Sequence, residues 1–321
     1  MIDNQKIYIK NFNPYKIDLP LVEVKRNIDN KFFYKAKIFK TDDKKFPLRV
    51  LLTGNHNTER FSLSITGSIR KWYFQENSKK DLKLDEFIKC LKKIANILYV
   101  DYEVLLKAKV TKLEIGITLS LPPHLRELKN CFISYGHSER KEYNNDTLYF
   151  NYQNFKLVIY DKYLEINGID SVEKKAMMTN VQKKVYNARY FFRFEISIKK
   201  MSGTNFSEKY DTIAKILKNW NELAITINEQ INAIKFLDAL SEDKDFEINT
   251  KKQLDRFLIF KSMKEITIND FLSYVKEKVL GNKSRMLNDY INIYNEHIAN
   301  NTNTKSVLIF ELNKGLNKLI N

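Results

Sequence analysis

Cysteine is scarce in this chain of 321 residues, which contains only Cys90 and Cys131. Two cysteines cannot build a disulfide framework, and by themselves they cannot complete a zinc site. The chain also lacks any run of about 18 apolar residues, the length that a membrane-spanning helix requires. The first ten residues include Asp3 and Lys6 and do not have the pattern of a secretory signal peptide. These absences favour a protein of the reducing cytoplasm with no membrane partner.

Basic residues are in excess, with 55 Lys and Arg against 39 Asp and Glu, which gives a formal net charge of +16. A polyanionic partner is therefore expected, because each neutralised phosphate of a nucleic acid releases condensed counterions. Part of the lysine excess has a second explanation, since abundant Asn and Ile accompany it, a bias that AT-rich coding DNA produces. Hydrophobic residues make up 43% of the chain, enough to bury a core.

The apolar pattern predicts an α+β fold, with an antiparallel sheet and flanking helices followed by a mainly helical part. Apolar residues at helical spacing predict a helix over 85–99. The polar run 134–146 is interpreted as a loop, and 171–187 as a helix or a linker. From residue 207 onward the pattern is helical, so we expect two domains, 1–205 and 206–321. Alternation predicts strands at 32–38, 48–52, 60–67, 112–118, 147–152, 157–162 and 192–197.

Three of these strands carry reactive side chains on a single face. Side chains alternate with a period of two along a strand, so residues two apart share a face. If the three strands are neighbours in one sheet, two carboxylates, a tyrosine, lysines and an arginine meet on one surface. Such a surface is suited to metal-dependent cleavage of a phosphodiester. The residues that share a face are Lys112 with Glu114, Tyr160 with Lys162, and Arg193 with Glu195 and Lys199.

The order of these motifs is characteristic as well as their content. An amphipathic helix is followed by TKLEIGIT at 111–118, LVIYDKYLE at 157–165 and FFRFEISI at 191–198. This order resembles that of the phage and plasmid replication proteins of the gene II/X family, the rolling-circle initiators of filamentous phages. That family carries an acidic strand, a tyrosine strand of the form L-V-x-Y-x-K, and an R-F-E strand in the same order.

The resemblance implies a role for each matched residue. Tyr160 matches the nucleophile, and Lys162 is the cation that would favour its phenolate. Glu114 and Glu195 match the acidic positions, and their hard oxygen atoms would hold Mg²⁺ or Mn²⁺. Glu114 stands where the family usually has Asp, so it is one methylene longer and needs a backbone adjustment to reach a metal. The residues expected to contact DNA are Arg193, Lys112 and Lys199.

The resemblance also implies a reaction and its partners. We expect the protein to nick one strand of a replication origin, leaving a 5′-phosphotyrosine link and a free 3′-OH. A second transesterification would later rejoin the displaced strand. Origin DNA, a host helicase and a host polymerase are the expected partners, in the cytoplasm of a bacterial cell.

Other interpretations of the same residues stay open. Tyr163 is a rival nucleophile, and Glu165 is a third carboxylate that is more typical of a surface. Glu114 and Glu195 on a strand face are also typical of ordinary ion pairs. A non-catalytic DNA-binding protein on a degenerate copy of the fold, or a transposase or relaxase-type strand transferase, would have a similar sequence. Relaxases with a His-x-His metal motif match less well, since none of the histidines occurs in that spacing; these are His56, His124, His137 and His297.

Further positions could contact nucleic acid. The lysines of the 85–99 helix and those of the 171–187 segment could follow phosphates, although a solvated surface explains any single lysine equally well. The aromatic residues 72–74 could stack on unpaired bases, but core packing is the preferred interpretation for at least two of them. The helices expected at 268–280 and 284–299, separated by Gly281, fit a helix-turn-helix and equally any helical hairpin.

Overall fold

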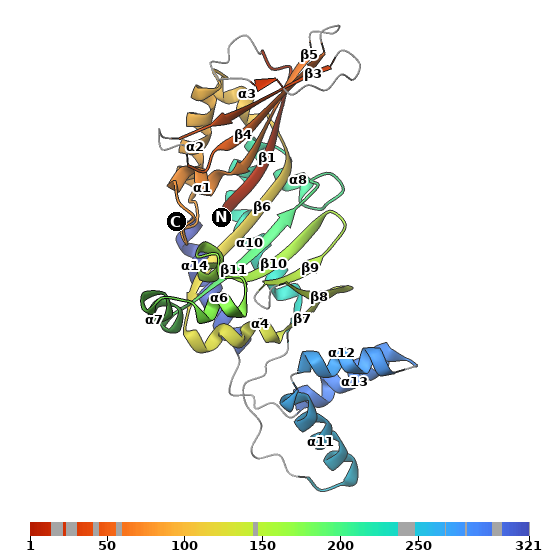
Figure 1. The fold of residues 1–321 in the computed structure, drawn as a ribbon. Coiled ribbons are helices and arrows are strands. Elements are labelled where there is room, and N and C mark those ends of the chain that lie inside the picture. Colours follow the sequence, from red (N-terminus) through yellow and green to blue (C-terminus); the bar gives the residue numbers. More distant parts are fainter. Residues whose placement is uncertain are drawn as a thin grey trace.

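A single large antiparallel sheet forms the centre of the computed structural model. The structure describes residues 1–13, 22–23, 31–40, 45–55, 60–143, 147–236, 248–266, 268–279, 281–296 and 304–320. Within these ranges twelve strands pair in the order β12-β7-β8-β9-β10-β11-β6-β1-β5-β4-β3-β2, and every neighbouring pair is antiparallel (Figure 1). The expected combination of helices with an antiparallel sheet is confirmed.

The strand β6 is the longest and lies in the middle of the sheet. It pairs with β11 on one side and with β1 on the other. It ends at Leu121, directly before Pro122 and Pro123, because proline cannot donate to a strand ladder. The strands are β1 (Ile2–Lys10), β2 (Val22–Glu23), β3 (Lys31–Ile38), β4 (Leu48–Asn55), β5 (Arg60–Ser68), β6 (Lys109–Leu121), β7 (Phe132–Tyr135), β8 (Ser138–Tyr143), β9 (Thr147–Asn151), β10 (Phe155–Asp161), β11 (Tyr190–Ile198) and β12 (Ile234–Phe236).

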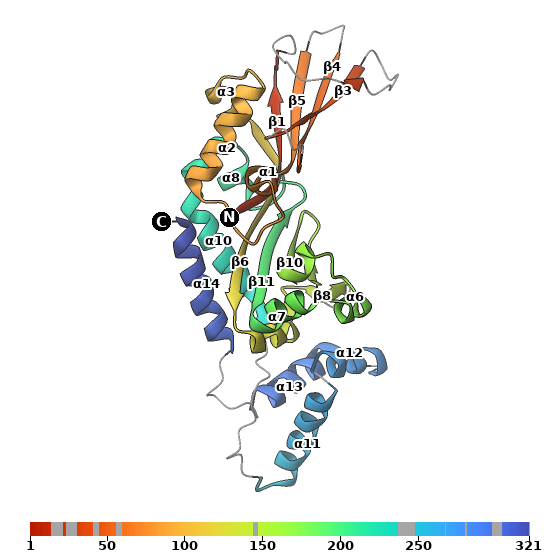
Figure 2. The same ribbon diagram turned by 60° about the vertical axis from the view of Figure 1, so that its left-hand side comes forward.

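Helices lie on both faces of the sheet. Helices α2, α3, α10 and α14 lie along one face, and the short helices α5 to α7 lie on the other (Figure 2). None of the described helices is long and apolar enough to cross a membrane. The helices are α1 (Ile69–Phe74), α2 (Leu84–Ile97), α3 (Tyr102–Leu106), α4 (Leu128–Cys131), α5 (Lys162–Ile166), α6 (Val172–Ala176), α7 (Asn180–Ala188), α8 (Ser207–Tyr210), α9 (Ile213–Lys218), α10 (Trp220–Ala233), α11 (Lys251–Glu265), α12 (Ile268–Lys278), α13 (Lys283–Glu296) and α14 (Thr304–Ile320).

The main hydrophobic core lies between the sheet and the larger helices. Strand β6 presents Ile115 and Ile117 to this core, while the alternate residues face the other side. Helix α14 approaches β6 closely at Gly315, where an added Cβ would lie 2.7 Å from Cδ2 of Leu119. The core also contains Leu91 of α2 and, beyond the sheet, residues of α8, α9, α10 and α14.

Hydrophobic packing does not follow the expected domain division at residue 205. Helices α8 to α10 and α14 belong to the same core cluster as the sheet. A separate cluster, centred on Phe260, Met263 and Leu272, is formed by α11, α12 and α13. The division into domains 1–205 and 206–321 stays a prediction.

Several expected elements differ in the structure. The run 134–146, interpreted as a loop, contains the second half of β7 and the whole of β8. Lys162, expected at the end of a strand, begins helix α5, because the Asp161 side chain accepts a hydrogen bond from the Tyr163 N–H and caps the helix. The segment 171–187 is helical, forming α6 and most of α7. Strand β1 was not expected, and neither was β12, which lies in the part expected to be helical.

Candidate active site

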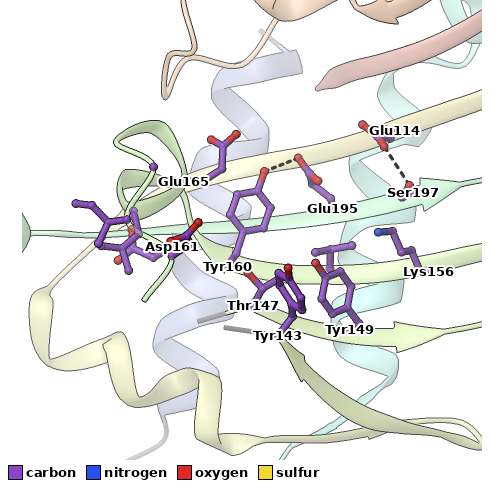
Figure 3. A pocket seen from close by; sticks show the side chains of 15 residues that line it. Glu114, Tyr143, Thr147, Tyr149, Lys156, Tyr160, Asp161, Glu165, Glu195 and Ser197 are labelled. Carbon is purple, nitrogen blue, oxygen red and sulfur yellow. Dashed lines mark hydrogen bonds between the residues drawn. The ribbon is translucent and has the colours of Figure 1, made fainter. Parts of the chain in front are cut away.

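The three strands that carry the reactive side chains are neighbours in the sheet. Strand β10 pairs with β11, which places Tyr160 opposite Arg193 and Lys156 opposite Ser197. Strand β11 pairs in turn with β6, which places Ser197 opposite Glu114. A cavity of about 440 Å³ opens on this face, over β6, β11, β10, β9 and the segment after α5 (Figure 3).

Tyr160 and Glu195 are in direct contact within this cavity. The Tyr160 hydroxyl donates a hydrogen bond to Oε1 of Glu195 at 2.9 Å (Figure 3). The same oxygen accepts a hydrogen bond from Nε of Arg193 at 3.0 Å. Further along β11 the Ser197 hydroxyl donates a hydrogen bond to Oε1 of Glu114, on the neighbouring strand β6, at 3.1 Å. The period-two pattern of the sequence therefore placed these side chains on one surface, as expected.

Burial and like charge dominate the electrostatics of the site. Burial, and next the Glu195 carboxylate, raise the pKa of Glu114 from 4.5 to about 7. The same two causes, in the same order, raise the pKa of the Tyr160 hydroxyl well above 10. In this arrangement the tyrosine is a neutral phenol, and its proton faces a carboxylate.

Lys162 lies near Tyr160 but forms an ion pair with Glu165. Its Nζ is 5.6 Å from the centre of the Tyr160 ring and 2.7 Å from Oε2 of Glu165. Burial lowers the pKa of Lys162, with Arg70 as the next cause. Lys162 was expected to lower the pKa of the Tyr160 hydroxyl. Instead that pKa is raised, because burial and Glu195 act in the opposite direction.

Arg193 is buried beneath the site rather than exposed on it. Its guanidinium is 0% exposed and pairs with three carboxylates, Asp81, Glu195 at 3.0 Å and Asp3 at 3.3 Å. It also donates to the Thr118 hydroxyl at 3.0 Å. The expected contact of Arg193 with DNA is therefore not supported by its position, and its geometry is that of a residue that orients Glu195.

Two acidic residues of this network were not found from the sequence. Asp3 of β1 pairs with Arg70 of α1 at 2.9 Å, and although burial acts against it, Arg193 and Arg70 lower the pKa of Asp3 to about 2. Asp81 accepts a hydrogen bond from the Thr118 N–H at 2.7 Å. Both carboxylates lie far from the three motifs in the sequence and belong to no periodic pattern, so only the fold brings them here.

The remaining candidates have definite positions. Tyr163 is buried, and its hydroxyl donates to the Gln182 carbonyl oxygen at 3.2 Å, away from Glu195. Glu165 lines the cavity and binds Lys162. Lys112 and Lys199 are exposed, as a DNA contact requires. His56 lies outside the described residues.

Aromatic residues 72–74 pack within the protein and do not extend into solvent, where they could stack on bases. Trp72 is 0% exposed and donates to the Ile38 carbonyl oxygen. Tyr73 and Phe74 pack edge to face with each other and are partly buried against the core. The preference for core packing is confirmed.

The carboxylates fit a hard divalent cation in part. Among the described residues no group of three or more His, Cys, Asp or Glu side chains is arranged to hold a metal ion. Glu114 and Glu195, however, offer oxygen ligands. The pKa of Glu114 is raised first by burial and then by the like charge of Glu195, and a cation would relieve that like charge. Mg²⁺ commonly binds one or two carboxylates and completes its shell with water and substrate phosphate. The residues present suit such a site.

Comparison with known protein families decides the affiliation. The model for the N-terminal part of the phage replication-associated protein encoded by gene II matches residues 20–230, more than half of the chain. The chain belongs to this family. The expectation of a gene II-type phage replication protein is therefore confirmed, and proteins of this type are in general nicking endonucleases that act in DNA replication. The matched range contains the whole of β6, β10 and β11. Searches of curated proteins and of solved structures each found no significant match.

Proposed function

We propose that this protein is a rolling-circle replication initiator that cuts one strand of its origin by transesterification at Tyr160. The observation that carries the proposal is the 2.9 Å hydrogen bond from the Tyr160 hydroxyl to Glu195, inside a cavity of a gene II-type chain. A buried, neutral phenol needs a proton acceptor before it attacks a phosphate, and Glu195 is in place for that role.

The proposed reaction can be written atom by atom. The Tyr160 oxygen attacks the phosphorus, and the bond between phosphorus and the 3′ oxygen breaks. The phenol proton passes to Oε1 of Glu195, and the departing 3′ oxygen takes a proton from water. The products are a 5′-phosphotyrosine link and a free 3′-OH. A divalent ion held by Glu114 and Glu195 would polarise the phosphate and stabilise its developing charge.

The neighbouring residues prepare Tyr160 and Glu195 for this step. Arg193 holds Glu195 through the same oxygen that faces Tyr160, which fixes the acceptor relative to the nucleophile. Lys162 and Glu165 form a pair at the edge of the cavity, which positions the ammonium group near the Tyr160 ring. In the cytoplasm of a bacterial host, a polymerase would extend the 3′-OH while a helicase unwinds the duplex, and a second transesterification would close the displaced strand.

Cleavage of a supercoiled plasmid tests the proposal. With Mg²⁺ or Mn²⁺ and a plasmid carrying its own replicon, the protein is expected to produce open circles. Tyr160→Phe removes only the attacking oxygen and is expected to lower the nicking rate about a thousandfold or more. Tyr163→Phe is the matched control, because that hydroxyl binds Gln182 outside the cavity, and it is expected to nick at nearly the normal rate.

Two outcomes would contradict the proposal. Normal nicking by Tyr160→Phe together with failure of Tyr163→Phe would transfer the nucleophile to Tyr163. Tight DNA binding without any nicking by the unmodified protein would favour the non-catalytic DNA-binding protein.

A further inference from the structure

A row of basic side chains crosses the sheet on the face that carries the candidate active site. The strand registers place Lys37 of β3 opposite Arg49 of β4, and Arg49 opposite Thr66 of β5. They continue the row with Thr66 opposite Lys6 of β1, and Lys6 opposite Lys112 of β6. Directly opposed residues of antiparallel strands point to the same face. Four of the five positions of this row are therefore cations; we refer to it as the basic row.

The basic row begins beside the site. Lys112 and Glu114 are two residues apart on β6, so they share a face and are separated by about 7 Å along the strand. Neighbouring strands lie about 4.8 Å apart, so the row extends about 19 Å from Lys112 to Lys37. Lys199, directly after β11 and exposed, adds a further cation at the end near the site.

The cations of the basic row are available to a ligand. Lys37, Arg49 and Lys112 are exposed and Lys6 is half-buried. Within the described part of the chain none of the four forms an ion pair. The only acidic residue in β1, β3, β4 and β5 is Asp3, whose carboxylate is buried with Arg70 and Arg193.

A second row, one step along the strands, has lysine at both ends. Lys35 of β3 lies opposite Leu51, and Tyr8 of β1 lies opposite Lys109 of β6, with Ser64 between Leu51 and Tyr8. The surface therefore has positive charge over two rows and no exposed carboxylate from these strands to oppose it. Evenly spaced cations without acidic neighbours match a polyanion whose charges are also evenly spaced.

We propose that the basic row binds the sugar–phosphate backbone of the DNA strand that leads away from the bond cut at Tyr160. The proposal rests on the proposed function and extends it to the strands β3 to β5, which carry none of the residues of the candidate site. The row would hold phosphates irrespective of base sequence, because long lysine and arginine side chains on a strand surface contact the backbone. Sequence would have to be read elsewhere.

The salt dependence of DNA binding tests the basic row. The triple variant Lys6→Gln, Arg49→Gln, Lys112→Gln removes three cations and no buried contact. For a single-stranded oligonucleotide the slope of log K against log salt changes by about 0.7 per phosphate contact, so a decrease of about 2 is expected. The same change predicts about a hundredfold weaker binding at 0.1 M salt. Binding is measured in a Tyr160→Phe background, so that no covalent capture contributes.

A second triple variant provides the matched control. Lys107→Gln, Lys314→Gln and Lys318→Gln remove the same charge from the end of α3 and from α14, which lie along the opposite face of the sheet. Thermal unfolding confirms that both triple variants are folded. The control is expected to keep the slope of the parent protein. Equal salt slopes for the two triple variants would contradict the proposal that the basic row binds DNA.

Failure of the basic row and failure of the proposed function give different results. If the unmodified protein nicks the origin plasmid but the row variant has an unchanged salt slope, only the proposal that the basic row binds DNA is rejected. If the salt slope changes in the row variant but the unmodified protein does not nick the plasmid, the proposed transesterification is rejected and the DNA contact of the basic row is retained. Vesicles containing phosphatidylserine serve as a second polyanion, and a loss of vesicle binding with unchanged DNA binding would contradict the proposed ligand.

Discussion

Glu114 lies on a buried part of β6, where the Glu195 carboxylate adds like charge to its surroundings. Its pKa rises from 4.5 to about 7, first through burial and then through Glu195. Between these two values the folded protein binds more protons than the unfolded chain. The contribution of this group to stability is therefore fully present below pH 4.5 and is lost as the pH rises towards 7.

Replacing Glu114 by Gln is expected to stabilise the metal-free protein at pH 8. The amide resembles the protonated acid, so the gain in free energy of unfolding is on the order of 3 kcal/mol at pH 8 and disappears near pH 4.5. Urea unfolding in a chelator at several pH values measures it. Added Mg²⁺ is expected to reduce the difference, because the cation would stabilise only the carboxylate.

Glu165 provides a control of opposite sign. Although burial acts against it, the hydrogen bond from Lys162 lowers the pKa of Glu165, so Glu165→Gln is expected to destabilise the protein at neutral pH. If the Glu114→Gln protein is no more stable than its parent at pH 8, the ionised Glu114 carboxylate does not destabilise the folded protein.

For side chains that belong to a periodic pattern, the sequence was sufficient to predict which face of the sheet they occupy. Alternation along β6, β10 and β11 predicted that Glu114, Tyr160 and Glu195 face one surface. It could not predict that Arg193 lies under that surface, because its burial depends on Asp3 and Asp81, which come from other elements. The family resemblance and the charge of Arg193 suggested a DNA contact, whereas tertiary packing pairs it with carboxylates.

The pairing of β6 with β11 requires a glycine beneath the site. At Gly116 an added Cβ would lie 2.6 Å from the Phe194 carbonyl oxygen and 2.9 Å from Cγ of Glu195. It would also lie 3.1 Å from Nη2 of Arg193. A side chain here must displace the strand or the two residues that face Tyr160.

Gly116→Ala is therefore expected to weaken both stability and activity. Overpacking of this kind destabilises by roughly 1–3 kcal/mol, and displacement of Glu195 is expected to lower the nicking rate beyond the effect on folding. Gly281→Ala is the control, since no atom lies within 4 Å of an added Cβ there. Unfolding and nicking are measured on both; equal behaviour of the two variants would mean that β6 tolerates a side chain at this point.

At the scale of elements, prediction failed where the apolar signal was weak. Strand β8 has the sequence SERKEY, in which polar residues fill both faces, so no alternation was visible. Its place is determined by pairing with β9. Helix α5 was missed for another reason: its capping residue, Asp161, is preceded by a clear strand, and the motif L-V-I-Y-D-K was interpreted as continuous.

Over the whole molecule, two hydrophobic clusters divide the helices that follow the sheet. Helix α14, the last in the chain, packs on β6, while α11 to α13 form their own cluster. The contacts of these helices with the rest of the protein include a hydrogen bond from Asn269 to the Asn130 carbonyl oxygen of α4 at 2.6 Å and the exposed pair Lys276–Glu139 at 2.8 Å. Ile133 of β7 also packs against this cluster. Exposed ion pairs contribute little to stability.

Removing residues 248–296 is expected to leave the rest of the protein folded. The excised protein should unfold within a few degrees of the parent and retain nicking, while any loss of origin affinity would identify α11 to α13 as a DNA-binding unit. Truncation after residue 303 is the contrasting control. It removes Leu308, Leu312 and Leu316 from the main core and is expected to destabilise by roughly 5 kcal/mol. Unfolding of the excised protein would refute the division into two clusters.

The most direct test of the central claim is the mass of the peptide that carries DNA after nicking. Trypsin cuts after Lys156 and Lys162, so Tyr160 and Tyr163 fall in different peptides, 157–162 and one that begins at 163. After nicking in Mg²⁺ or Mn²⁺ and digestion with nuclease, we expect a nucleotide adduct on peptide 157–162 that is absent in Tyr160→Phe. An adduct on the peptide that begins at Tyr163, or nicked DNA with no adduct, would contradict it.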